Sequence, residues 1–338
     1  MISSPQITVL GSGTSAGVPT IGCDCETCVS RDPRDTRTRT CAAVEWIDPT
    51  GQHRLVLIDA GPDFRQQALR HNLRRCDALF VTHNHTDHIF GIDELRRFNA
   101  VMDGNPPIGV WAEPRCWTAL RRVYQHVMEK AGNVNPSFVA NLVAHELPEL
   151  DYEGGAGSPI DLWGMRFTPI RTLHGKLPIL AFRIEPVEAV AGVDDGEHAG
   201  APRLLPAAWV TDTSAVPTRS WRHLADLRTL FLDGLRHRRH PTHFTLDEAQ
   251  HCAARAAADR TFLIHIAHEV LHARDEPALE PGVRFAVDGL VLRQELSGGL
   301  VASVERRPGR REPYVWPEAG VAGAANVDPS DAAARVER

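Results

Sequence analysis

The sequence has no long hydrophobic run, no excess of positive charge and no even set of cysteines. Because no apolar stretch approaches the roughly 20 residues that a bilayer-spanning helix needs, a membrane partner is not expected. The formal net charge is −6 and the pI is about 6.3, which argues against a nucleic-acid partner. Seven cysteines, an odd number, suit a reduced compartment with thiolate ligands better than a disulfide framework.

The start of the sequence has no basic segment followed by an apolar core, as a secretory signal would require. Gln6 to Leu10 instead predicts a strand at once, and we expect a cytoplasmic protein. With 338 residues, 43% of them hydrophobic, the chain can bury a substantial core. We expect a single domain over residues 1–306 with a surface insertion at 186–206, followed by a disordered tail at 307–338.

Three histidines and a carboxylate follow one short apolar run. Residues 78–81 predict a buried strand, which leads into His83-Asn-His85-Thr-Asp87-His88. Ligand-binding groups usually lie at the carboxyl ends of strands in layered α/β proteins. Four potential ligands this close together do not easily converge on one tetrahedral ion, so two adjacent metal ions are the simpler arrangement. The alternative, a solvated polar loop, is disfavoured by the ordered spacing behind a buried strand.

The same pattern, an apolar strand followed by a histidine or an aspartate, recurs along the chain. Further instances are Asp59, His174, Asp212 and His265. A lone histidine or aspartate at the end of a strand is more often structural. Their recurrence supports an α/β fold more than any single motif does.

A second candidate metal site lies near the start of the chain. Cys23-Asp-Cys25-Glu-Thr-Cys28 supplies three soft ligands, one fewer than a closed structural zinc site requires. Clustered exposed thiols oxidise readily, which disfavours three free surface cysteines. We expect the fourth ligand to come from elsewhere in the sequence.

The order His83-x-His85-x-Asp87-His88, then His174, Asp212 and His265, resembles the signature of metallo-β-lactamase fold hydrolases. The resemblance covers roughly residues 5–295 and implies a four-layer αββα sandwich with two central mixed β-sheets. It implies that one divalent ion is bound by His83, His85 and His174, the other by Asp87, His88 and His265, with Asp212 bridging. It further implies that Asp59 buttresses a metal-bound histidine.

The opening segment is similar to that of one subfamily, the cyclic phosphodiesterases of the phosphonate-degradation pathway. The similarity rests on Gly11-Ser-Gly-Thr-Ser-x-Gly-Val-Pro, the three cysteines, and Asp32-Pro-Arg34. In that group a late histidine completes a structural zinc site, and His268 stands at the matching position, three residues after His265.

Pro241-Thr-His243-Phe-Thr resembles the segment in which phosphodiesterases of this fold carry an extra histidine near the metals. Such an imidazole can donate a proton to the leaving alkoxide or hold a phosphate oxygen. We expect His243 to act in catalysis together with the ligands Asp87 and Asp212. His240 is a weaker candidate, expected to be solvated, and no role is assigned to Asp233 or Arg236.

The resemblance implies a phosphodiesterase that hydrolyses a small cyclic or diester phosphate, such as a ribosyl 1,2-cyclic phosphate or a nucleotide. Two ions about 3.5–4 Å apart can share a hydroxide formed at neutral pH and clamp a phosphoryl group. The expected cofactors are two catalytic Mn²⁺ or Zn²⁺ ions, since mixed nitrogen and oxygen ligands accept either, and one structural Zn²⁺. Dimers are common near this fold, which leaves a homodimer open.

Three other functions fit parts of the same pattern. A nuclease similar to the tRNA 3′-end endoribonucleases is disfavoured because the segment at 186–206 is acidic on balance. Thioester or lactam hydrolysis uses the same metal ligands but is disfavoured by the cysteine cluster combined with His243. A non-catalytic zinc-stabilised protein, akin to cofactor-biosynthesis relatives, is disfavoured by the full ligand set.

Overall fold

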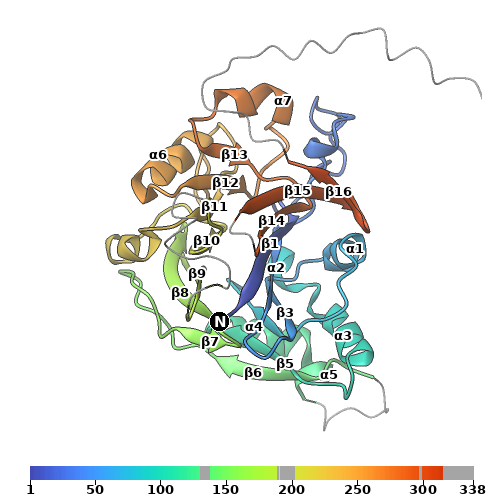
Figure 1. The fold of residues 1–338 in the computed structure, drawn as a ribbon. Coiled ribbons are helices and arrows are strands. Elements are labelled where there is room, and N and C mark those ends of the chain that lie inside the picture. The colour runs from blue at the N-terminus through green and yellow to red at the C-terminus, as the bar shows by residue number, and fades with distance from the viewer. Residues whose placement is uncertain (130–137, 189, 191–201, 297–298, 315–338) are drawn as a thin grey trace, which may run out of the picture.

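The computed structural model describes residues 1–129, 138–188, 190, 202–296 and 299–314 (Figure 1). The chain forms two mixed sheets. The first has the strand order β16 (Arg310–Pro313), β15 (Leu300–Arg307), β14 (Leu290–Gln294), β1 (Ser3–Gly11), β2 (Cys41–Ile47), β3 (His53–Ile58), β4 (Ala78–Phe80), β5 (Ile108–Ala112) and β6 (Leu142–Glu146). The second has the order β13 (Val283–Phe285), β12 (Arg260–Ile264), β11 (Thr229–Asp233), β10 (Ala207–Val210), β9 (Leu177–Pro186), β8 (Met165–His174) and β7 (Ile160–Leu162).

Helices cover the outer face of each sheet, which gives the four-layer αββα sandwich. The α-helices are α1 (Phe64–Arg70), α2 (Thr86–Ile89), α3 (Arg96–Val101), α4 (Pro114–Val123), α5 (Gln125–Met128), α6 (Leu246–Ala256) and α7 (His272–Asp275). Short 3-10 helices lie at Pro33–Asp35, Ile92–Leu95, Thr218–Leu224 and Glu276–Ala278. Figure 1 shows α1 and α3 on one side of the molecule and α6 on the other. No helix in the described part of the chain is long and apolar enough to cross a membrane.

Alternation along the strands explains the layering. In β3, Val56 and Ile58 belong to the apolar cluster between the sheets, whereas Leu55 and Leu57 belong to the cluster under α1, α3 and α4. Successive strand side chains point to opposite faces, so a strand buried on both faces is apolar throughout. A third cluster packs α6 on the outer face of the second sheet. Both sheets are therefore fixed between apolar layers, and their strand ends are held in place.

The expected start of the tail at residue 307 falls inside a hairpin of the described chain. Residues 307–314 were assigned to a disordered tail, but β16 pairs with β15 and the backbone N–H of Tyr314 donates to the carbonyl of Ala302 at 3.0 Å. Pro308 and Gly309 form the turn of this hairpin, with Gly309 at φ +72°, a conformation that glycine adopts without strain. Residues 315–338 and most of the insertion, 189 and 191–201, lie outside the described residues.

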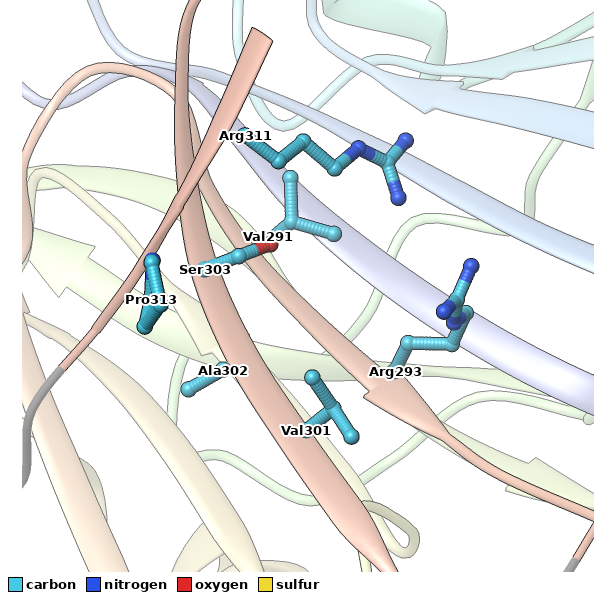
Figure 2. A pocket seen from close by; sticks show the side chains of 7 residues that line it. All are labelled: Val291, Arg293, Val301, Ala302, Ser303, Arg311 and Pro313. Carbon is cyan, nitrogen blue, oxygen red and sulfur yellow. The ribbon is translucent and has the colours of Figure 1, made fainter. Parts of the chain in front are cut away.

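A pocket on the β14–β16 face holds no candidate metal ligand. Figure 2 shows Arg293 and Arg311 beside Val291 and Val301 in its lining. Arg293 pairs with Glu295 at 2.6 Å and Arg311 with Glu305 at 3.0 Å, so carboxylates neutralise both guanidinium groups. The candidate metal ligands lie instead at the strand ends.

A buried ion pair joins the two sheets. Arg171 of β8 is fully buried and donates hydrogen bonds to the carboxylate of Glu113, which directly follows β5. The same guanidinium donates to the carbonyls of Ile179 at 3.0 Å and Leu150 at 2.9 Å. Because a buried cation requires both a counter-charge and satisfied N–H groups, each part of this cluster depends on the others.

Replacing Glu113 by alanine is expected to lower the free energy of unfolding by about 3–5 kcal/mol, because Arg171 would remain buried without its partner. The matched control is Asp161→Ala, which removes the partner of Arg166 at the surface and should cost less than about 1 kcal/mol. Denaturant unfolding followed by tryptophan fluorescence measures both. An equal loss of unfolding free energy in the two variants would contradict a stabilising role for the buried Arg171–Glu113 ion pair.

Candidate active site

Strand ends from both sheets meet at one place. His83 and His85 follow β4, and Asp87 and His88 lie in α2. From the second sheet, β8 ends at His174, Asp212 comes two residues after β10, and His265 comes directly after β12. The structure thus brings together all seven residues that the sequence singled out as catalytic metal ligands.

Three residues at these strand ends have a left-handed backbone conformation. Asp59, Asp212 and His265 have φ values of +63°, +51° and +60°. Residues other than glycine rarely adopt this left-handed conformation, and where it occurs the surrounding structure has to hold it. Each of these turns directs a charged or imidazole side chain into the same buried space.

The candidate ligands form two neighbouring groups. The ligand atoms of His83, His85 and His174 lie within 4.8 Å of one another, and so do those of Asp87, His88, Asp212 and His265. Asp212 is close to both groups. Its Oδ1 lies 3.2 Å from His88 Nε2, and its Oδ2 lies 3.1 Å from His265 Nε2 and 3.9 Å from His83 Nε2.

The unpaired nitrogens of the cluster fit bound metal ions. Within the described residues, the buried Nε2 atoms of His83, His88 and His265 have no hydrogen-bond partner, an arrangement that is rare unless an ion or water accounts for it. Ligand atoms bound to one tetrahedral ion at 2.0–2.1 Å lie about 3.4 Å apart. The distances of 3.1–3.9 Å around Asp212 agree with that spacing.

Electrostatics divides the histidines into two kinds. Burial opposes charge on His88 and His265, but the carboxylates outweigh it: Asp212, Asp59 and Asp87 raise the pKa of His88, and Asp212 and Asp87 raise the pKa of His265 to about 10. Burial lowers the pKa of His83, His85 and His174. The first group therefore attracts positive charge, and the second offers neutral imidazoles with a free lone pair.

Hydrogen bonds from behind fix the ring orientations. Asp59 is fully buried, lies 2.7 Å from His88 Nδ1, and accepts hydrogen bonds from Thr82 N and Oγ1, each at 2.8 Å. His174 Nδ1 donates to the carbonyl of Thr242 at 2.7 Å. Partners of this type select the tautomer and aim the other ring nitrogen at the ligand position.

Asp233 is a site residue to which we assigned no role from the sequence. It is fully buried at the end of β11, and its carboxylate lies 3.0 Å from His243 Nδ1 and 3.6 Å from His265 Nδ1. It also accepts a hydrogen bond from the backbone N–H of Phe244 at 2.9 Å. The available signal was its position, because it ends an apolar strand as Asp59 and Asp212 do.

His243 lies against both ligand groups. Its ring centroid is 4.5 Å from that of His174 and 4.6 Å from that of His265, onto which it stacks at an interplanar angle of 12°. Because Nδ1 is held by Asp233, Nε2 is the nitrogen that can serve a substrate. The geometry therefore places the imidazole of His243, which is not one of the seven candidate ligands, directly beside them.

The cysteine cluster is closed by His268. The Sγ atoms of Cys23 and Cys25 each lie 3.3 Å from His268 Nδ1, and Cys28 belongs to the same group. Tetrahedral Zn²⁺ with bonds of about 2.3 Å to sulfur and 2.0–2.1 Å to nitrogen separates such ligands by about 3.6 Å. Burial opposes the thiolate, but the hydrogen bond with His268 lowers the pKa of Cys25 to about 6, which favours the metal-binding form.

Comparison with known proteins agrees with this architecture. The β-lactamase superfamily domain matches residues 54–266. A solved diphosphatase of the PhnP family is 34% identical with a TM-score of 0.71, covering 87% of this chain and 98% of that one. Human tRNase Z, short form, shares the fold at 19% identity and a TM-score of 0.56, over 85% of this chain and 98% of that one.

A curated relative, the octanoyltransferase of Porphyromonas gingivalis, is 31% identical over 317 residues. The match covers 93% of this chain, which spans 56% of the relative's length. Together with the domain match, the two sheets and the strand-end cluster, these similarities identify the family. The chain belongs to the β-lactamase superfamily and has the metallo-β-lactamase fold.

Proposed function

We propose that the protein is a metal-dependent phosphodiesterase that hydrolyses a small cyclic or diester phosphate. One observation supports this most: a buried aspartate holds the His243 imidazole beside two groups of metal-binding side chains. Such an arrangement combines a place for the phosphoryl group with a proton donor for its leaving oxygen.

In the proposed site His83, His85 and His174 would hold one ion, and Asp87, His88 and His265 would hold the other. Asp212, whose carboxylate faces His83 as well as His88 and His265, would serve both groups. Mn²⁺ or Zn²⁺ suits these nitrogen and oxygen ligands. When bound, such a pair would supply a nucleophile derived from water at neutral pH and would take up charge on the phosphoryl oxygens.

The residues of the chain then carry out the remaining steps. Asp59 keeps His88 oriented, and the Thr242 carbonyl keeps His174 oriented. His243 would donate the proton on Nε2 to the leaving oxygen, while Asp233 holds the ring in place through Nδ1. Cys23, Cys25, Cys28 and His268 would hold a structural Zn²⁺ and so stabilise the loop that carries the cysteines.

The comparisons favour a second candidate within the same chemistry. A diphosphatase at 34% identity supports hydrolysis of a diphosphate linkage, which has the same reacting group and needs the same side chains. The name octanoyltransferase is not carried over, because much of that relative lies outside the match. A tRNA-processing role rests on a likeness of fold alone.

The first prediction concerns the reaction. With Mn²⁺ or Zn²⁺ added, the protein should hydrolyse bis(p-nitrophenyl) phosphate faster than p-nitrophenyl phosphate. Asp212→Ala should reduce the rate more than about 100-fold, since even the outer partners of metal ligands are worth about 10–100-fold. The control is Asp103→Ala at an exposed aspartate, which should keep the wild-type rate. No diester hydrolysis by metal-loaded protein would rule out the proposal.

The second prediction concerns His243. Replacing it by alanine should slow 2′,3′-cyclic AMP hydrolysis by about 10²–10⁴-fold, because the alkoxide leaving group needs a proton. Hydrolysis of bis(p-nitrophenyl) phosphate should fall far less, because p-nitrophenolate leaves without protonation. Steady-state kinetics on the two substrates measures the ratio, and an equal fall on both would exclude the proton-donor role.

The third prediction concerns the structural zinc. Cys25→Ser should bind one zinc ion fewer per chain and unfold at a lower temperature, because a structural zinc site contributes directly to folding free energy. Cys252→Ala, in α6 and outside the cluster, should keep the wild-type zinc content. Metal analysis after gel filtration decides the matter, and full zinc content in Cys25→Ser would contradict the assignment.

A further inference from the structure

His240 is anchored by the loop that carries the proposed proton donor. Its Nδ1 lies 3.4 Å from the backbone N of Thr242 and 3.1 Å from Thr242 Oγ1. A backbone N–H can only donate, so Nδ1 accepts and the ring hydrogen is on Nε2. Burial, followed by the neighbouring His243 and Arg236, lowers the pKa of His240, which keeps this single N–H donor at neutral pH.

Thr242 links His240 to the rest of the site. Its carbonyl holds His174, while its N–H and hydroxyl hold His240. The space for this loop is tight, since a Cβ added to Gly175 would lie 2.8 Å from Thr242 Cγ2. The orientation of His240 is therefore tied to that of a candidate metal ligand.

The donor nitrogen of His240 is available to a ligand. The residue is partly exposed, and within the described residues its Nε2 has no hydrogen-bond partner. The ring centroid of His240 is 5.1 Å from that of His243, which in turn lies 4.6 Å from His265. The ring of His243, the proposed proton donor, thus neighbours both His240 and the candidate metal ligand His265.

The loop around His240 carries excess positive charge. Arg236 pairs with Glu269 at 2.5 Å, and Arg238 approaches the same carboxylate at 3.9 Å. Exposed Arg239 has no ion-pair partner in the part of the chain that the structure describes. One carboxylate does not balance three guanidinium groups, so this rim of the site favours an anion.

We propose that His240 binds an oxygen of the substrate's leaving group, and that the site thereby selects leaving groups that carry a phosphate. The inference rests on the proposed function, because it assumes that His243 faces the leaving oxygen. A phosphate on the next atoms would meet Nε2–H of His240, and the net positive charge of Arg236, Arg238 and Arg239 would attract it. An aryl leaving group offers no acceptor there and gains nothing from these residues.

The test compares two replacements of opposite character. His240→Asn retains an acceptor for Thr242 near the Nδ1 position but removes the outer donor. His240→Gln retains an amide N–H near the Nε2 position. The probe is AMP, a leaving-group product with a phosphate, titrated calorimetrically into metal-loaded protein. Orthophosphate is the control ligand, because it reports on the metal pair alone.

The expected result is a selective loss. His240→Asn should weaken AMP binding about 10–100-fold, the range for one hydrogen bond to a charged group, and change orthophosphate binding less than about 3-fold. His240→Gln should stay within about 5-fold of wild type for AMP. Unchanged AMP binding in His240→Asn, equal losses in both variants, or wild-type binding of AMP no tighter than of orthophosphate would each overturn the proposal.

The two proposals fail separately. Hydrolysis of bis(p-nitrophenyl) phosphate by the same wild-type preparation reports on the phosphodiesterase assignment. The binding ratio of AMP to orthophosphate reports on His240 whether or not that diester is turned over.

Discussion

The structure depends on two carboxylates that are buried among imidazoles. Asp87 and Asp212 lie almost out of solvent at the junction of the two sheets, where an unpaired negative charge is costly. Neighbouring imidazoles offset this cost, because the two carboxylates raise the pKa values of His88 and His265 and so favour their protonated forms. A pair of divalent cations would meet the same requirement and also engage the unpaired nitrogens of His83, His88 and His265. Chemistry and stability are therefore coupled at this point.

Short-range contacts connect the cysteine loop to the catalytic strand end. Arg37 is fully buried, pairs with Asp35 at 2.9 Å, and donates to the carbonyls of Ala267 and Val270. These carbonyls flank His268 and follow His265 by a few residues. On the other side, Thr14 N donates to the carbonyl of Ile266 at 3.2 Å. One segment thus carries a candidate ligand for each proposed metal site, and residues on both sides of the cysteine loop hold that segment in place.

Much of this arrangement is visible in the sequence because it follows local rules. Apolar runs that end in histidine or aspartate predicted the strand ends. The structure also has a capping box at the start of α6, where Thr245 and Glu248 stand at the spacing that this motif requires. The roles of Asp233 and Thr242 depend on contacts between strands and loops that no spacing reveals. We expected His240 to be solvated, and its hydrogen bonds with Thr242 could not be foreseen because they arise only when the loop folds. Residues 307–314 form a hairpin and not the expected tail, because a Pro-Gly turn within a hairpin resembles a disordered segment in composition.

The most direct test of the central claim is anomalous X-ray diffraction from crystals grown with Mn²⁺ or Zn²⁺. We expect two anomalous peaks about 3.5–4 Å apart within the cluster of histidines and aspartates, with Asp212 in contact with both. A zinc-edge map should show a further peak among the three cysteines and His268. A single peak, or none, at the strand ends of metal-saturated protein would contradict the account.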